Sequence, residues 1–267
     1  MTDSLIFCVM GYNRLMISEK NNIDHEELRI TRELELVNDL VESENLLELS
    51  RLLEIDLADL ELSLKCVGRG RRKAGSNPDI TPQTHFSHMA RVAMMVKQYF
   101  PDDIVGRRLA VLHDAKEEAT MGMEKLYLES DLSPLIDMMT EEMPTEDEID
   151  FMKSVIPAGF DPIYFSKYKT FIGKLHTDWH IFKSLELCDR LDGTSSLSYL
   201  LNPKYTSRLK LKALESLGRI WATIDRDSGD IVVEKIKNNC RTWFDIFGVT
   251  ENEVEVISGF FVDEHSA

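Results

Sequence analysis

Cysteine is scarce in this sequence, and the spacings that zinc binding or redox chemistry uses do not occur. The four cysteines, Cys8, Cys66, Cys188 and Cys240, are widely separated, and none belongs to a Cys-x-x-Cys pair. We therefore expect reduced thiols rather than a disulfide framework, as is usual in the cytoplasm.

Long apolar runs are also absent. The longest one near the N-terminus, residues 5–10, is far shorter than the roughly 20 residues that span a bilayer. No basic segment precedes it, so no signal peptide is expected. These absences predict a cytoplasmic protein without a membrane partner.

Positive charge is in short supply. Lysine and arginine total 31 against 47 acidic residues, which gives a net charge of -16. This balance excludes a general binder of nucleic-acid polymers, because such proteins neutralise phosphates with lysine and arginine. A small anionic ligand in a local basic pocket remains allowed, and the one dense basic run, with Arg71, Arg72 and Lys73, lies in the glycine-containing loop 68–75.

Strand-like alternation, internal repeats and low-complexity segments are missing as well, so the prediction is an all-α fold. Apolar residues recur at near-helical spacing over 24–65, where two or three amphipathic helices are expected. Further helices are predicted around His88, over 104–120, over 121–140, over 206–224 and in the C-terminal part. We expect an N-terminal helical extension (1–60), a helical-bundle domain (61–230) and a C-terminal segment packed on it (231–267).

A histidine and three carboxylates gather in residues 112–118, directly after an apolar run. If the helix continues there, residues three and four apart share a face, so His113 and Glu117 lie together. His113 and Asp114 can then bind a divalent metal, with Glu117 within reach of a water bound to it. The alternative is a solvated helix face with one stray histidine.

Two other polar residues interrupt apolar stretches in ways that favour the metal site. His88 begins one such stretch and Asp189 lies within another. A carboxylate in an apolar helix is costly unless it is paired, hydrogen-bonded or bound to metal. His88, His113, Asp114 and Asp189 on successive helical segments would form a four-ligand site, whereas His85 is interpreted as structural.

The order of His88, His113-Asp114 and Asp189 resembles the signature of the HD-domain phosphohydrolases, whose helices surround a metal. More narrowly, residues 62–221 resemble the hydrolase domain of the RelA/SpoT family, which removes the 3'-diphosphate from guanosine tetra- and pentaphosphate. The landmarks are similar in order: a basic run, a threonine-proline step, a His-x-x-x-Val-Ala helix, a Leu-His-Asp-x-x-Glu motif and an Asp-Arg-Leu helix. Their members here are 71–73, 81–82, 88–93, 112–117 and 189–191.

The resemblance implies an HD-domain bundle that holds one divalent ion, Mn²⁺ or another metal, and acts on a small nucleotide. Glu117, with Glu118, would orient water or accept its proton, and the substrate's charge would be offset by Arg71, Arg72, Lys73 and Lys183. The chain departs from the family pattern at Gln83, Met89, Glu118, Glu186 and Gly193. Neither the physiological nucleotide nor the oligomeric state follows from the sequence.

Two other functions stay open. An HD 5'-nucleotidase or deoxynucleoside triphosphate hydrolase would keep the metal site and change the substrate, and His-Asp-Ala-x-Glu followed by Met121-Gly122-Met123 is similar to the HD 5'-nucleotidases. A module that binds a nucleotide or a partner without turnover is the non-enzymatic alternative.

Overall fold

The computed structural model describes residues 25–70, 84–140, 143–155, 162–163, 166–167, 178–195, 231–247, 250 and 252–253. Within these ranges the ordered elements are helices and no β-strand occurs, which confirms the all-α prediction. They are α2 (His25–Glu42), α3 (Leu46–Leu53), α4 (Leu57–Val67), α5 (His85–Tyr99), α6 (Ile104–Ala110), the 3-10 helix η1 (Leu126–Glu129), α7 (Ser133–Met139), α8 (Glu146–Val155), α10 (Trp179–Ser195) and α12 (Ile231–Phe247).

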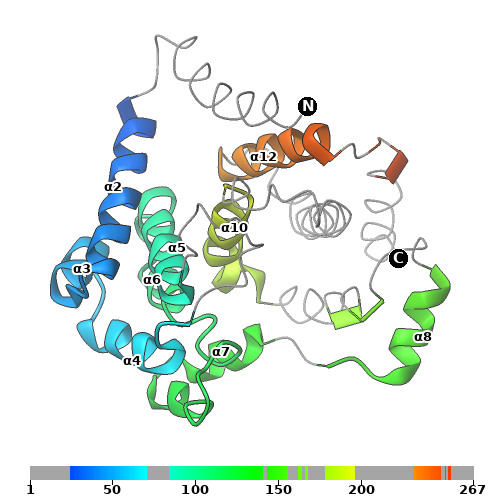
Figure 1. Cartoon of the computed structure of the whole chain (residues 1–267), viewed down its shortest axis with the longest axis horizontal. Helices are drawn as coiled ribbons and strands as arrows, with labels where there is room; N and C mark the ends of the chain where they lie inside the picture. The colour runs from blue at the N-terminus through cyan, green and yellow to red at the C-terminus, as the bar shows by residue number, and fades with distance from the viewer. Residues whose placement is uncertain are drawn as a thin grey trace, which may run out of the picture.

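Helix α5 lies at the centre, against α2, α4, α6 and α10 (Figure 1). The Thr84 side chain caps its N-terminus by accepting a 3.0 Å hydrogen bond from the Ser87 backbone. Residues 85–96 are buried, so α5 has no solvated face over most of its length. It ends at Tyr99 because Pro101 follows, as the predicted break at 99–103 requires.

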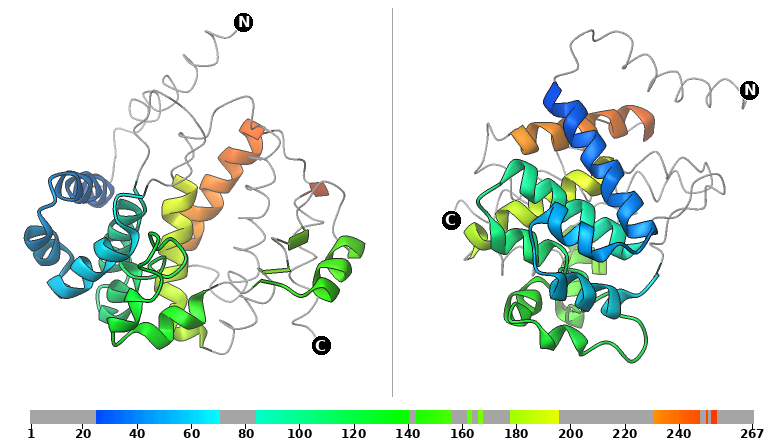
Figure 2. Two further views of the ribbon diagram at one scale, coloured as in Figure 1. Left: turned by 60° about the horizontal axis from the view of Figure 1, so that its bottom comes forward. Right: turned by 90° about the vertical axis from the view of Figure 1, so that its left-hand side faces the viewer.

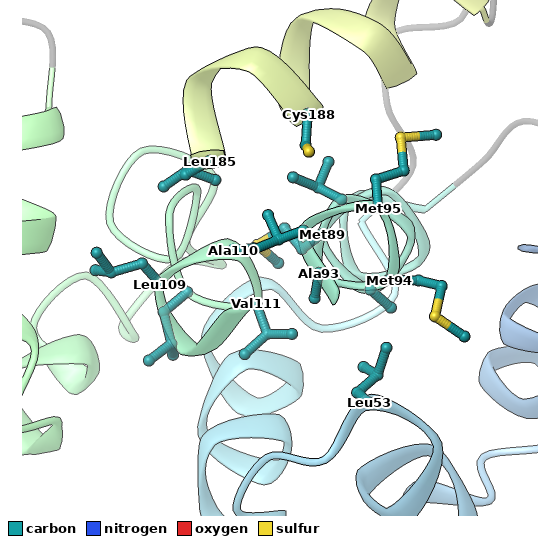
Figure 3. Packing of buried hydrophobic residues seen from close by; sticks show 14 of the residues in the cluster. Leu53, Met89, Ala93, Met94, Met95, Leu109, Ala110, Val111, Leu185 and Cys188 are labelled. Atoms are coloured by element: carbon teal, nitrogen blue, oxygen red, sulfur yellow. The ribbon is translucent and has the colours of Figure 1, made fainter. Parts of the chain in front are cut away.

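The core forms around α5. Figure 3 shows Met89 and Ala93 of α5 between Leu109 and Ala110 of α6, Leu185 and Cys188 of α10, and Leu53 of α3. The same cluster of buried side chains extends from Val37 in α2 to Cys240 in α12. The described parts of both terminal segments therefore share the core with α5, and Figure 2 shows α12 lying along α10. The domain boundaries at residues 60 and 230 stay a prediction.

Two cationic side chains from α5 and α6 form hydrogen bonds with the end of α3 and so hold it against this core. The buried Arg107 of α6 donates to the Leu53 carbonyl at 3.3 Å and to Glu54 at 3.0 Å, and Lys97 of α5 donates to the Leu52 carbonyl at 2.7 Å. The last carbonyls of a helix lack partners within the helix and carry partial negative charge, so both contacts stabilise the end of α3. Hydrogen bonds from Lys97 and Arg107 hold the pKa of Glu54 below its ordinary value.

The predicted helix over 104–120 is wrong in its second half. Helix α6 ends at Ala110, and residues 111–118 form successive turns. Backbone bonds from Leu112 to Leu109 and from Ala115 to Leu112, both 2.9 Å, span three residues rather than four. The His113 Nδ1 donates to the Ala110 carbonyl, which in a continued α-helix would accept from the backbone N–H of residue 114. The cation of this segment, Lys116, donates to Asp137 of α7 at 2.6 Å.

The long helix predicted over 121–140 is also wrong. The chain forms only η1 and α7 there, because Gly122 adopts a positive φ of 88° and Pro134 starts a new helix at its first turn. Leu132, Ile136 and Met139 are buried as expected, whereas Leu128 is exposed. The helix predicted over 206–224 lies outside the described residues, and the C-terminal helix is confirmed as α12.

The described cysteines Cys66, Cys188 and Cys240 are buried and form no disulfide. Burial raises the pKa of the Cys240 thiol to about 12, so it packs as a neutral side chain. Among the helices that the structure describes, none combines the length and the hydropathy that a bilayer crossing requires.

Gly106 sets the approach of α6 to α10. A Cβ added there would lie 2.4 Å from both the Ser184 Oγ and the Asp103 Oδ2. Asp103 caps α6 by accepting a 2.7 Å bond from the Gly106 backbone and is itself hydrogen-bonded by Ser184, so neither group can move without losing a partner. Gly106→Ala is predicted to lower the free energy of unfolding by about 1–3 kcal/mol in urea titrations.

Gly193→Ala is the matched control, since Gly193 lies in α10 with no heavy atom within 4 Å of the added Cβ. That variant should gain up to about 1 kcal/mol from helix propensity. Equal stability of the two variants would contradict the close packing of α6 on α10.

Candidate metal site

Three segments far apart in the sequence bring the predicted metal ligands together. His88 comes from α5, His113 and Asp114 from the turns that follow α6, and Asp189 from α10. One ligand atom each of His88, His113 and Asp114 lies within 4.8 Å of the other two. The Asp189 Oδ1 is 3.0 Å from the His88 Nε2. The packing of α5 against both α6 and α10 is what brings these ligands together.

The four candidate ligands differ in how far their side chains are exposed to solvent. The exposed fraction of the side chain is 1% for His88, 7% for His113, 13% for Asp189 and 22% for Asp114. The two imidazoles meet edge to face, with ring centroids 5.3 Å apart. A ligand would therefore approach from the side of the two carboxylates, while the histidines form the buried wall.

Both histidines present the nitrogen that a metal requires. The His113 Nδ1 is 2.8 Å from the Ala110 carbonyl, which can only accept, so Nδ1 carries the hydrogen and Nε2 keeps its lone pair. The His88 Nδ1 is 2.7 Å from the Asp192 Oδ2 and donates to it in the same way. A histidine ligand in metalloproteins ordinarily donates its second nitrogen to a carbonyl or carboxylate.

Asp189 is ionised despite its surroundings. Burial alone would raise the pKa of its carboxyl, but the positive charge of the neighbouring Arg190 holds that pKa well below the ordinary value. Asp114 and Asp189 contribute two negative charges to a donor set completed by the His88 and His113 nitrogens. This set of two nitrogens and two carboxylates matches the charge of a divalent ion and the ligands of Mn²⁺, Fe²⁺ or Zn²⁺.

The sequence reasoning missed two residues behind His88. Asp192 is buried and accepts from Arg91, with Nε to Oδ1 at 2.9 Å and Nη2 to Oδ2 at 3.0 Å. Burial would raise the pKa of Asp192, but Arg91 and His88 hold it below the ordinary value. Helical spacing places Arg91 three residues after His88 and Asp192 three residues after Asp189, on the same helix faces, but it does not show that either charge is buried.

The predicted acid–base residues lie on the exposed side. Glu118 is 3.3 Å from the Nε2 of His85, which is buried one turn before His88 on α5. Glu117 is exposed, and the helical spacing that was to place it beside His113 does not apply to the turns 111–118. The catalytic roles of Glu117 and Glu118 stay predictions.

The structure describes part of the predicted substrate site. Lys183 is half-buried on α10. Glu186 is buried, and its Oε2 lies 3.9 Å from the Arg190 Nε. Arg71, Arg72 and Lys73 lie outside the described residues. Gly70, the residue before Arg71, accepts a 3.0 Å backbone hydrogen bond from His85. Gly70 therefore lies next to the first turn of α5.

Comparisons of the chain with protein-family models, with curated proteins and with solved structures find no match. The resemblance to HD-domain hydrolases stays a hypothesis.

The buried Arg91–Asp192 pair predicts a large stability effect. Arg91→Met would leave the Asp192 carboxylate without its bidentate partner in an apolar environment, and breaking a buried pair in this way costs about 3–5 kcal/mol. Arg29→Met removes an exposed pair with Glu33 and should cost less than about 1 kcal/mol. Chemical unfolding measures both, and similar losses would contradict the burial of the Arg91–Asp192 pair.

Proposed function

We propose that this protein is a metal-dependent phosphohydrolase that acts on a small nucleotide. The observation that carries the proposal is the convergence of His88, His113, Asp114 and Asp189 from three separate segments. Metal sites need such convergence, whereas solvated charges on helix faces do not. The contacts of Asp189 with His88 and Arg190 give the same residues a purely structural role as the alternative.

The donor set fits a divalent ion. His113 and His88 each direct Nδ1 to an acceptor and keep Nε2 for the ion, and Asp189 is ionised. We propose Mn²⁺, although another divalent metal would suit the same ligands. When bound, such an ion supplies Lewis-acid chemistry, which lowers the pKa of water and withdraws charge from a phosphoryl oxygen.

The chain's own residues supply the remaining groups. Glu118, held by His85, offers an exposed carboxylate that can accept a proton from attacking water, and Glu117 is its neighbour. Lys183, together with Arg71, Arg72 and Lys73, would offset the charge of a polyphosphate. The Gly70–His85 hydrogen bond supports this role, because it holds Gly70, which directly precedes Arg71 in the sequence, one turn from the ligand His88.

For the substrate we propose guanosine 3',5'-bis(diphosphate), with diphosphate leaving from the 3' position. Because the chain is acidic overall, a local run of cations in its sequence favours an anionic ligand. A nucleotide with two diphosphates requires more cations to offset its charge than a nucleoside monophosphate does.

A substrate panel tests the proposal. Diphosphate and phosphate release would be measured from guanosine 3',5'-bis(diphosphate) and from nucleoside mono- and triphosphates, with Mn²⁺ and with a chelator. We expect Mn²⁺-dependent diphosphate release from the first compound. Turnover of a panel nucleotide alone would reassign the enzyme to a 5'-nucleotidase or deoxynucleoside triphosphate hydrolase. No turnover anywhere, together with nucleotide binding, would favour the non-catalytic module.

Ligand variants test the residues. His113→Ala and Asp189→Ala should abolish Mn²⁺-dependent turnover, because each removes one of four donors. His180→Ala is the matched control, since His180 is exposed on α10, and it should keep full activity. Circular dichroism would establish that each variant is folded. Folded ligand variants with wild-type activity would contradict the proposed site.

A further inference from the structure

We infer that Arg91 and Asp192 are positioning residues for the metal ligand His88, and that Asn38 ties them to the N-terminal helix α2. The inference rests on the proposed metal site. It assigns a role in metal binding to three residues that are not ligands themselves.

The chain of contacts begins at the ligand. The His88 Nδ1 donates to the Asp192 Oδ2 at 2.7 Å, on the opposite side of the ring from the Nε2 that faces Asp189. His88 and Asp192 are both buried. A ring held at Nδ1 cannot turn about its own bonds without losing this hydrogen bond, so Asp192 fixes the direction of the Nε2 lone pair.

Arg91 holds Asp192 in turn. Its guanidinium binds both carboxylate oxygens at 2.9 and 3.0 Å, a bidentate geometry that fixes the plane of the carboxylate as well as its position. The third nitrogen, Nη1, donates to the Asn38 Oδ1 at 3.1 Å and to the Ser87 Oγ at 3.3 Å. One guanidinium therefore joins α2, α5 and α10. Figure 1 shows α5 between the other two helices.

A comparison within the chain separates positioning from simple ion pairing. Arg108 also binds a buried aspartate, Asp59, through two nitrogens at 2.7 and 3.3 Å. Asp59 lies on α4 and has no contact with a candidate ligand among the described interactions. Both pairs join a buried aspartate to an arginine through two nitrogens. Arg108 is more exposed than Arg91 and also binds Asp131, and Asp192 is the aspartate of the two that contacts a candidate ligand.

The first experiment measures the Kd for Mn²⁺ alone, by calorimetric titration of the full chain without substrate. Asp192→Asn should weaken Mn²⁺ binding by about 10- to 100-fold, the usual effect of removing the hydrogen-bond partner of a histidine ligand. Asp59→Asn removes the same charge from the matched ion pair and should leave the Kd within about twofold of wild type. Unfolding in urea, measured on both variants, separates lost stability from lost affinity.

A milder variant keeps the inference testable if Asp192→Asn does not fold. Asn38→Ala removes one contact to Arg91 from a half-buried position on α2 and should weaken Mn²⁺ binding several-fold, by about 3- to 10-fold. In the Asp192→Asn background the same change should have no further effect, because the connection to His88 is already broken.

The outcomes separate this inference from the proposed function. A wild-type chain that binds no Mn²⁺ would overturn both. Wild-type binding with an unchanged Kd in folded Asp192→Asn, or in Asn38→Ala where Asp192→Asn does not fold, would overturn the positioning role and leave the metal site intact. Equal weakening in Asp192→Asn and Asp59→Asn would also overturn it, since loss of any buried ion pair would then suffice.

Discussion

The buried pair of Arg91 and Asp192 is the interaction on which the arrangement of this protein depends. Taking two charges out of water is costly, and only a bidentate geometry with further hydrogen bonds offsets that cost. Here the pair lies between α5 and α10. Asp192 also accepts a hydrogen bond from His88, and Arg91 also donates one to Asn38 of α2. Because hydrogen bonds weaken steeply when their distance or angle departs from the optimum, the bidentate contact restricts how α5 and α10 meet, and hence where His88 and Asp189 face each other.

Much of the fold could be predicted from the sequence, because apolar spacing and helix-breaking residues act locally. The break between α5 and α6 follows from Pro101, and Leu49, Leu53 and Leu60 are buried in helices as their spacing indicates. The failures occur where tertiary contacts or turn chemistry override that spacing. Residues 111–118 have a helical pattern, yet the His113 ring takes the carbonyl that would extend α6. Gly122 and Pro134 divide the helix expected over 121–140, although the apolar spacing continues through them.

The candidate site was predictable in its ligands and not in its support. A histidine or an aspartate inside an apolar stretch stands out in a sequence, because burying such a group is costly unless it has a partner. His88 and Asp189 could be predicted as ligands for this reason. Asp192 and Arg91 are also buried. Their burial cannot be read from the sequence, because buried and solvated helix faces both carry charges at similar spacing. Only the packing of α5 on α10 reveals that these residues face inwards. The pairing of Glu118 with His85 likewise joins two elements and follows from no local pattern.

The most direct test of the metal site is a crystal structure of the chain grown with Mn²⁺, with diffraction recorded at the manganese absorption edge. The account predicts a single strong anomalous peak within coordination distance of the Nε2 atoms of His88 and His113 and of the carboxylates of Asp114 and Asp189. It also predicts that the His88 Nδ1 still donates to Asp192 in that structure. No peak at these four residues, or one surrounded by other side chains, would contradict it.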